Sequence, residues 1–437
     1  MHSSLLLTLF LFLTSHWFCL LSQRPVPQNA PDKPLVFKGL TLHMGNGQKI
    51  QDGVLAIHQG RIVYSGPRAG FSEIPNAEVR EFKDAHAYPG FILMDNILGL
   101  TETDALKPTH DFRETGEINP EVRACVAFNT DSKIIPTVRS NGILLVQSTP
   151  RGALLAGTSA VMRLDGWNWE DAAVLCQDGV HVYWPESPVR TRQKSEDAKE
   201  DPDISRKSKL QRLELFFRQA QAYAFNQNPP QEKNIHLEAL KPVLKGTSPL
   251  YIHASGAVSV VEALDFFKAF GNIRRVLCGM PDTGRALDYI QEEKIPVILS
   301  RIHALPPRDD ADYDLPYRMP AILERRGIPF ALSYAGDMEA MGSRNLPFLA
   351  GTAVAFGLDY ERAVAAISSV PAKILGIEKD YGSLEKGKSA TFFISLGDAL
   401  DMRTQDVKIA FIDGRPLDLD NHQKVLYRQY LQKYGLN

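Results

Sequence analysis

Through the middle of the chain, short apolar runs alternate with longer segments that repeat at helical spacing. Seven runs have the length and the β-type content of buried strands: residues 91–94, 143–147, 180–183, 250–253, 276–278, 297–299 and 330–333. Helical spacing is seen at residues 257–270, 285–292, 318–326 and 360–368. This alternation is typical of βα units, so the pattern predicts an α/β fold. An eighth strand cannot be recognised from the pattern.

Both ends of the chain show a different pattern, in which short β-type runs are joined by tight turns. Near the N-terminus, two such runs flank Gln59-Gly60, which is a hairpin signal. Near the C-terminus, residues 391–394 and 407–412 are further β-type runs. We therefore predict one small β-domain built from residues 35–87 and 382–415.

An apolar run sets the first residues apart from the rest of the chain. Residues 5–21 are mostly apolar, and a break rich in Pro and Gln follows them. This arrangement is typical of a secretory signal peptide, so residues 1–22 are predicted to be removed. A retained membrane anchor is the alternative, but polar residues at 14–16 leave the run short for a span. We expect export to the periplasm or the extracellular space, with no stable membrane span in the mature chain.

The composition narrows the class of protein. The 437 residues are 44% hydrophobic and 23% charged, as in ordinary soluble globular proteins. The net charge of -2 favours no polyanionic partner, so no nucleic-acid binding is expected. Outside the N-terminal run, Cys125, Cys176 and Cys278 are widely spaced and predict neither a disulfide framework nor a zinc-type cysteine pair. The charge-dense segment 190–212 predicts a solvated loop or helix face.

The last residues predict a terminal helix. Within segment 421–437, apolar residues recur near helical spacing, with Lys, Arg and Gln between them. One interpretation is that this helix packs back on its own chain. The other is that it reaches a second subunit.

Six groups of short motifs occur in a fixed order. They are YPGFI at 88–92, NGI at 141–143 leading to TPRG at 149–152 and LAGTS at 155–159, LDGWNWE at 164–170, RNLP at 344–347, PAKILG at 371–376 and GSLEKGKSA at 382–390. In this order they resemble the imidazolonepropionase-like branch of the amidohydrolase superfamily over residues 35–415. The resemblance implies a (β/α)8 TIM-type barrel at 88–376, joined to a small composite β-sandwich domain formed from both chain ends.

The resemblance also implies a metal centre at the strand ends, where the family holds one or two divalent metals. The two histidines of the family's first strand correspond to Asp95 and Ile97, and Ile97 cannot bind a metal. His253 matches the histidine of strand five, and Cys278 stands where strand six has a histidine. Asp337 lies two residues after the position of the strand-eight aspartate. We therefore expect one zinc-like divalent metal, weak or absent, with His253, Asp337, Cys278 and Asp95 as candidate ligands.

Roles for single residues follow from the same comparison. Asp337 and His253 are the candidate catalytic residues, since a carboxylate can carry a proton from water to the leaving nitrogen. His303 and Arg151 are the candidates for substrate binding. The structural alternatives are a satisfied polar residue at His253, a small buried hydrophobe at Cys278 and a turn former at Asp337.

Two functions stay open. The first is that of an exported hydrolase acting on a carbon–nitrogen bond of a small amide or cyclic ligand. The second is that of a catalytically inactive family member, because replacing both first-strand histidines removes half the usual ligand set. Such a protein would bind a ligand or partner an active paralogue. A homo-oligomer and a heteromer with that paralogue are the assemblies to be considered.

Overall fold

The computed structural model describes residues 27–103, 105–152, 154–186, 202–227, 232–280, 285–306 and 310–436. The predicted signal peptide, residues 1–22, lies outside the described residues. No helix in the described part of the chain is both long and apolar enough to cross a bilayer.

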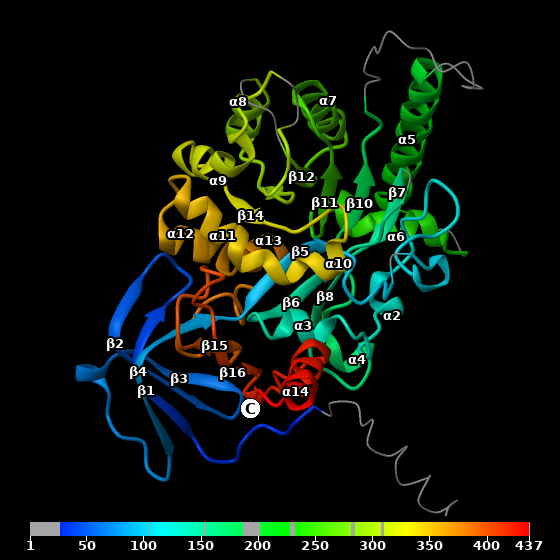
Figure 1. Ribbon diagram of the computed structural model, residues 1–437. Helices are drawn as coiled ribbons and strands as arrows, with labels where there is room; N and C mark the ends of the chain where they lie inside the picture. The colour runs from blue at the N-terminus through cyan, green and yellow to red at the C-terminus, as the bar shows by residue number, and fades with distance from the viewer. Residues whose placement is uncertain are drawn as a thin grey trace, which may run out of the picture.

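One seven-stranded sheet contains strands from both ends of the chain (Figure 1). Its strands, in spatial order, are β17 (Arg415–Pro416), β16 (Val407–Ile412), β15 (Phe392–Ser395), β4 (Glu78–Pro89), β1 (Leu35–His43), β2 (Lys49–His58) and β3 (Arg61–Pro67). β15 pairs antiparallel with β4, which places Phe392 opposite Pro89. Gln59 and Gly60 join β2 to β3 with φ angles of 47° and 77°, the left-handed values that a tight hairpin turn needs.

The middle of the chain forms two further sheets. The first contains β14 (Phe330–Leu332), β13 (Val297–Leu299), β12 (Arg274–Gly279), β11 (Pro249–His253), β10 (Val180–Tyr183) and β7 (Leu155–Thr158). The second contains β5 (Phe91–Asn96), β6 (Ile143–Ser148), β8 (Ala160–Arg163) and β9 (Ala173–Leu175). All seven predicted strands are present, and β10 to β14 run parallel to one another.

An extended segment at residues 155–163 links these two sheets and corrects the expectation of an all-parallel ring. Its first half, β7, pairs antiparallel with β10, and its second half, β8, pairs antiparallel with β6. At the other edges, Met94 of β5 forms an isolated parallel bridge with Ser333 after β14. The arrangement is consistent with a TIM-type barrel in which one position is filled by a reversed strand. This reversal explains why no eighth βα unit could be recognised in the sequence.

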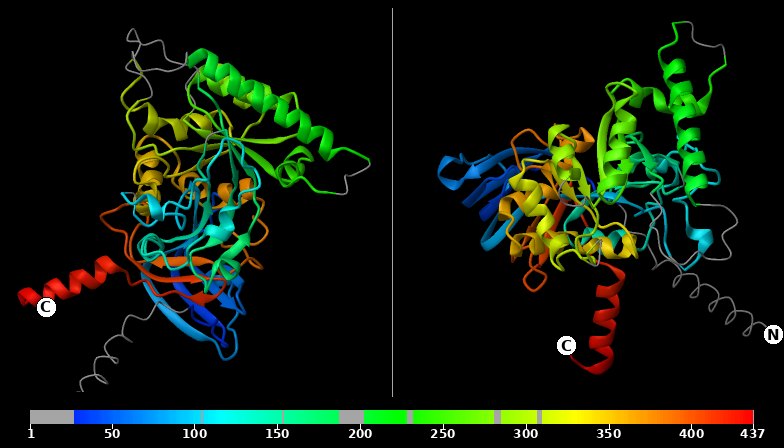
Figure 2. Two further views of the ribbon diagram at one scale, coloured as in Figure 1. Left: turned by 90° about the vertical axis from the view of Figure 1, so that its right-hand side faces the viewer. Right: turned by 90° about the horizontal axis from the view of Figure 1, so that it is seen from above.

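Helices lie around the strands of the two middle sheets (Figures 1 and 2). They are α2 (Ala124–Ala127), α3 (Ile135–Arg139), α4 (Trp169–Ala172), α5 (Pro202–Ala224), α6 (Ile235–Leu244), α7 (Ala257–Lys268), α8 (Arg285–Glu292), α9 (Leu315–Arg325), α10 (Glu339–Gly342), α11 (Leu346–Ala355), α12 (Tyr360–Ala366), α13 (Ser369–Leu375) and α14 (His422–Tyr434). All of these helices except α14 contribute apolar side chains to one continuous core with the strands of the two middle sheets. The charge-dense segment continues into α5, so its described part is helical.

The cysteines depart from the sequence prediction. Cys125 in α2 and Cys176 just after β9 form a disulfide, with their Cα atoms 5.2 Å apart. Cys278 is a free, buried thiol. The sequence predicted no disulfide framework, and the structure adds one disulfide to that interpretation, because the fold brings together two residues that are separated by 51 positions in sequence.

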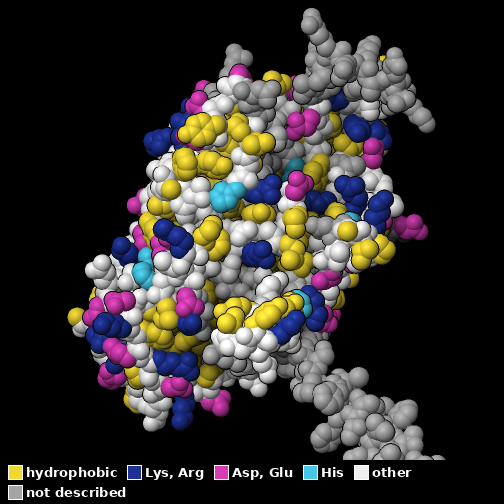
Figure 3. Space-filling model, viewed as in Figure 1, with side chains coloured by type: hydrophobic (Ala, Val, Ile, Leu, Met, Phe, Trp, Pro, Cys, Tyr) yellow, Lys and Arg dark blue, Asp and Glu magenta, His cyan; other side chains and the backbone are white. Residues whose placement is uncertain are grey.

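The C-terminal helix α14 forms as predicted and projects away from the rest of the molecule (Figure 2). Asn421 caps its start by accepting a hydrogen bond from the backbone N–H of Lys424, and Gly435 ends it with a left-handed φ of 63°. None of its residues is buried. Figure 3 is viewed with α14 pointing toward the reader. At the place where Figure 1 labels α14, hydrophobic and basic side chains lie side by side on the surface. The interpretation that α14 packs back on its own chain is therefore not supported.

Candidate active site

Three potential metal ligands from three different strands converge near the carboxyl ends of those strands. Asp95 is near the end of β5, His253 ends β11 and Cys278 lies in β12, directly opposite His253 in the strand register. One ligand atom from each lies within 4.8 Å of the others. The carboxyl ends of barrel strands are where TIM-type enzymes place their chemistry. The structure thus brings together three of the four predicted metal ligands.

Asp95 is held in an unusual backbone conformation that fixes its side chain. Its φ of 47° is left-handed, which Asp tolerates better than most residues. Its backbone N–H donates to Oε1 of the buried Gln147 at 3.0 Å. The next residue, Asn96, donates from Nδ2 to the carbonyl oxygens of Tyr334 at 2.7 Å and Glu339 at 3.2 Å. The two Asn96 bonds tie the end of β5 to the loop after β14 and to the start of α10.

Gln147 belongs to a second buried polar group deeper in the structure. Its Nε2 donates to Oδ2 of Asp178 at 2.7 Å, and the Tyr251 hydroxyl donates to the same oxygen at 2.8 Å. Burial raises the pKa of Asp178 to about 6, against the lowering effect of these hydrogen bonds. Asp178 therefore acts on the site indirectly: it orients the Gln147 side-chain amide, whose oxygen accepts the hydrogen bond from the Asp95 backbone N–H.

Arg151 holds the Asp95 carboxylate from the side away from His253. Its Nη1 donates to Asp95 Oδ1 at 2.5 Å and to the Tyr183 hydroxyl at 3.0 Å. Its Nη2 donates to the Asp95 carbonyl at 3.0 Å and to Glu339 Oε1 at 2.8 Å. Burial raises the pKa of Asp95, but the Arg151 charge, the nearby His253 and His181 rings and the Arg151 hydrogen bond together outweigh it and bring the pKa to about 2. Asp95 is therefore ionised at neutral pH.

Glu339 is the acidic residue that the sequence comparison missed. Besides Arg151, it accepts hydrogen bonds from the backbone N–H groups of Ile97 at 3.1 Å and Gly336 at 2.9 Å. Burial raises its pKa, and the Arg151 charge opposes that rise. The only sequence signal was its position at the start of α10, two residues after Asp337.

His253 belongs to a pair of imidazoles. Its Nε2 lies 2.9 Å from His181 Nδ1, and its Nδ1 lies 3.8 Å from Asp95 Oδ2. Burial lowers the pKa of His253 to about 4 and that of His181 well below its usual range. Both rings are therefore neutral at pH 7. When His253 donates its Nε2 proton to His181, its Nδ1 lone pair faces Asp95 and Cys278, which is the form a metal ligand needs.

These residues fit one divalent ion of zinc type. A carboxylate oxygen, an imidazole nitrogen and a thiolate are zinc donors, and three protein ligands leave a further position open. Burial raises the pKa of Cys278 well above its usual value, so ion binding at this site has to release the thiol proton. A second ion does not fit beside Asp95 Oδ1, because the Arg151 guanidinium fills that side.

Of the other predicted residues, Arg151 bonds to Asp95, whereas Asp337 and His303 do not belong to the group of three potential ligands. Asp337 is exposed and lines a cavity of about 670 Å³. Arg151 also lines this cavity, whereas Asp95, His253 and Cys278 do not. The remaining lining residues are Ile97, His110, Phe112, Arg113, Gly152, Tyr183, Gly336, Met338 and Glu339. His303 does not line this cavity, and its Nε2 is bonded to Thr352 Oγ1 at 2.7 Å.

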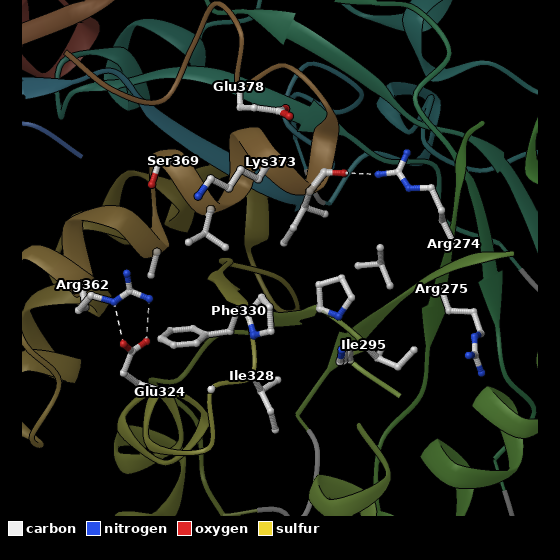
Figure 4. A pocket seen from close by; sticks show the side chains of 18 of the residues that line it. Arg274, Arg275, Ile295, Glu324, Ile328, Phe330, Arg362, Ser369, Lys373 and Glu378 are labelled. Carbon is white, nitrogen blue, oxygen red and sulfur yellow. Dashed lines mark hydrogen bonds and ion pairs between the residues drawn. The ribbon is translucent and has the colours of Figure 1, made fainter. Parts of the chain in front are cut away.

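A larger cavity, of about 830 Å³, lies at the amino ends of β12, β13 and β14 (Figure 4). Several of its charged residues form pairs with one another, such as Arg362 with Glu324 and Arg275 with Glu293. This end of a TIM-type barrel generally serves stability, and the three converging ligands lie at the other end. Volume alone therefore does not identify the candidate site.

Comparison with known proteins gives a family match and a fold match. Residues 318–417 match the amidohydrolase family. No curated protein matches the chain by sequence. An amidohydrolase structure from Thermotoga maritima MSB8 has a TM-score of 0.76 at 23% identity, covering 88% of this chain and 99% of its own.

Two further structures show the same fold at lower similarity. Molinate hydrolase has a TM-score of 0.54 at 14% identity, covering 89% of this chain and 95% of its own. A prolidase solved with N-methylphosphonate-L-proline has a TM-score of 0.55 at 13% identity, covering 88% of this chain and all 100% of its own. The narrower resemblance to the imidazolonepropionase-like branch stays a prediction. The sequence match to the amidohydrolase family is limited to residues 318–417, and the solved structures show that the fold is shared over most of the chain.

Proposed function

We propose that this protein hydrolyses a carbon–nitrogen bond of a small amide at a one-metal centre formed by Asp95, His253 and Cys278. The convergence of these three side chains within 4.8 Å is the observation that supports it. The family match at residues 318–417 supports the hydrolase class independently, because it contains none of the three ligands.

Each residue has a distinct role in this proposal. A bound divalent ion would polarise the amide carbonyl and make an attacking water more acidic. Asp95 and the Cys278 thiolate supply the negative charge that holds the ion, and His181 orients the His253 ring. Asp337, exposed on the cavity wall, is the carboxylate that carries the proton to the leaving nitrogen. Glu339 is less suited to proton transfer, since both its oxygens already accept hydrogen bonds.

The proposal includes export from the cytoplasm. The disulfide between Cys125 and Cys176 supports it, because disulfides persist mainly in oxidising compartments. The signal-peptide prediction for residues 1–22 points to the same compartment.

A second candidate function is ligand binding without catalysis. Its support is the state of the acidic groups below the cavity: Asp95 and Glu339 are both paired with Arg151, with side chains only 4% and 7% exposed. A small amide or cyclic ligand in the 670 Å³ cavity would then be bound and not cleaved. Association with an active paralogue belongs to this second candidate.

One set of measurements separates the two candidates. Metal content of the purified mature protein is measured before any metal is added, and we expect less than one zinc-like ion per chain. Hydrolysis of a panel of lactams, N-acyl amino acids and Xaa-Pro dipeptides is then followed with added Zn²⁺. The last class is included because prolidase and Xaa-Pro dipeptidase are among the structural neighbours.

Matched variants assign the activity to the site. His253→Gln and Cys278→Ser should abolish Zn²⁺-dependent turnover, and His236→Gln, at an exposed histidine bonded to Glu121, should not. Turnover that survives His253→Gln contradicts the proposed centre. Binding of panel members in the cavity without turnover supports the second candidate. Absence of both binding and turnover rejects both functions for these amides.

A further inference from the structure

Four oxygen atoms surround the two terminal nitrogens of Arg151. They are Asp95 Oδ1 at 2.5 Å, the Asp95 carbonyl at 3.0 Å, Glu339 Oε1 at 2.8 Å and the Tyr183 hydroxyl at 3.0 Å. The three residues come from β5, β10 and α10, so the cluster is assembled by the fold and not by one local segment. Asp95 and Glu339 are buried, and the Arg151 side chain is only 14% exposed.

This set of atoms has the chemistry of a site for a hard cation. Carboxylate, backbone carbonyl and hydroxyl oxygens are the ligands that Mg²⁺, Mn²⁺ and Ca²⁺ prefer. Two buried carboxylates at one place also require positive charge, because an uncompensated buried charge is strongly destabilising. We propose that Arg151 is a built-in cation that occupies a divalent-ion position between Asp95 and Glu339.

The guanidinium suits this position better than a mobile ion in one respect. Its planar fork reaches both carboxylates at once, and it cannot be removed by a chelator. Its charge is permanent, because a guanidinium stays protonated in proteins. The inference goes beyond the proposed function and does not rest on it, since it holds whether or not the ion site at His253 is used.

The experiment asks whether removing the guanidinium opens the position to an ion. Mn²⁺ binding to metal-stripped protein is measured by equilibrium dialysis and electron paramagnetic resonance, without substrate. Arg151→Met removes the charge and keeps a long side chain, whereas Arg151→Lys keeps the charge. Arg113→Met removes an exposed arginine from the wall of the same cavity and is the matched control. All variants also carry His253→Gln, which disables the other ion site.

The expected result is one additional Mn²⁺ per chain in Arg151→Met and none in Arg151→Lys or Arg113→Met. Adding Glu339→Gln to Arg151→Met should abolish that binding. The inference is overturned if the Arg151→Met variant folds but binds no additional ion. It is also overturned if the binding of that ion persists when Glu339→Gln is added. If Arg151→Met does not fold alone, Mn²⁺ should restore its folding, and failure to do so also overturns it. Failure of the proposed function would be seen separately, as lack of turnover in the wild-type protein.

Discussion

Removing the disulfide between Cys125 and Cys176 should cost a large part of the stability of this protein. The bond closes a loop of 51 positions that runs from α2 through β7 and β8 to the end of β9. For a loop of this length, the chain-entropy relation gives a stabilisation of about 4 kcal/mol at 25 °C. Domains are typically stable by only about 5–15 kcal/mol, so the double substitution Cys125→Ala/Cys176→Ala should be readily measurable.

The measurement is urea unfolding followed by circular dichroism, with and without a reductant. In the absence of reductant, the double variant should unfold at markedly lower urea than the wild type. Reductant should lower the urea midpoint of the wild type toward that of the variant and should leave the midpoint of the variant unchanged. This comparison separates the effect of losing the bond from the effect of losing side-chain packing. Thiol labelling of the unfolded, unreduced protein should detect Cys278 but not the bonded pair.

Two results would refute this reasoning. One is that the double variant loses less than about 1 kcal/mol of its free energy of unfolding, which would mean that the loop is already ordered in the unfolded chain. The other is an equal response of wild type and variant to reductant, which would mean that the bond does not form. The second result would also remove the support that the disulfide gives to export.

Three further predictions concern the site and the two ends of the chain. Burial lowers the pKa of His253 to about 4, so as the pH falls below 6.5 this histidine takes up a proton in the unfolded chain before it does so in the folded protein. The free energy of unfolding of the metal-free protein should therefore drop by about 3 kcal/mol between pH 6.5 and 4. In urea titrations, the His253→Gln variant should lack this part of the pH dependence. A chain without residues 1–88 loses β4, which pairs with β15, so it should elute as an aggregate in size-exclusion chromatography. A soluble monomer that folds cooperatively would contradict the conclusion that the two chain ends share one sheet. Deleting residues 422–437 should change the free energy of unfolding by no more than about 1 kcal/mol, because none of α14 is buried, and a shift from oligomer to folded monomer in light scattering would assign the helix to a subunit interface.

The strands of the middle region were predictable because their signal is local. Each buried parallel strand needs a short apolar run, and all seven such runs form strands. The reversed segment at 155–163 has the same local character, with buried residues on both sides of Ser159. Its direction depends on antiparallel pairing with β6, which precedes it, and with β10, which follows it, and the apolar pattern of a segment does not say which strands it pairs with.

The candidate site was predictable only where a family position could be matched. Asp95, His253 and Cys278 were reached through the strand ends that carry them, and the structure brings them together. Glu339 was missed because its role depends on a buried bond to Arg151, across 188 positions of sequence. The disulfide was missed for the same reason, since wide spacing along the chain says nothing about distance in the fold.

Relative to the family pattern that the sequence resembles, Asp95 and Ile97 are better understood as a rearrangement of charge than as a simple loss of two metal ligands. An ionised Asp95 at the end of β5 needs a buried cation, and Arg151 provides it while also pairing with Glu339. Ile97, at the second histidine position, contributes its backbone N–H to Glu339. Substituting Asp95→His and Ile97→His would therefore leave Arg151 short of one carboxylate and place a buried cation beside two imidazoles. A two-metal centre could not form there unless Arg151 changed as well, because the guanidinium occupies the space and the charge that a second ion would need.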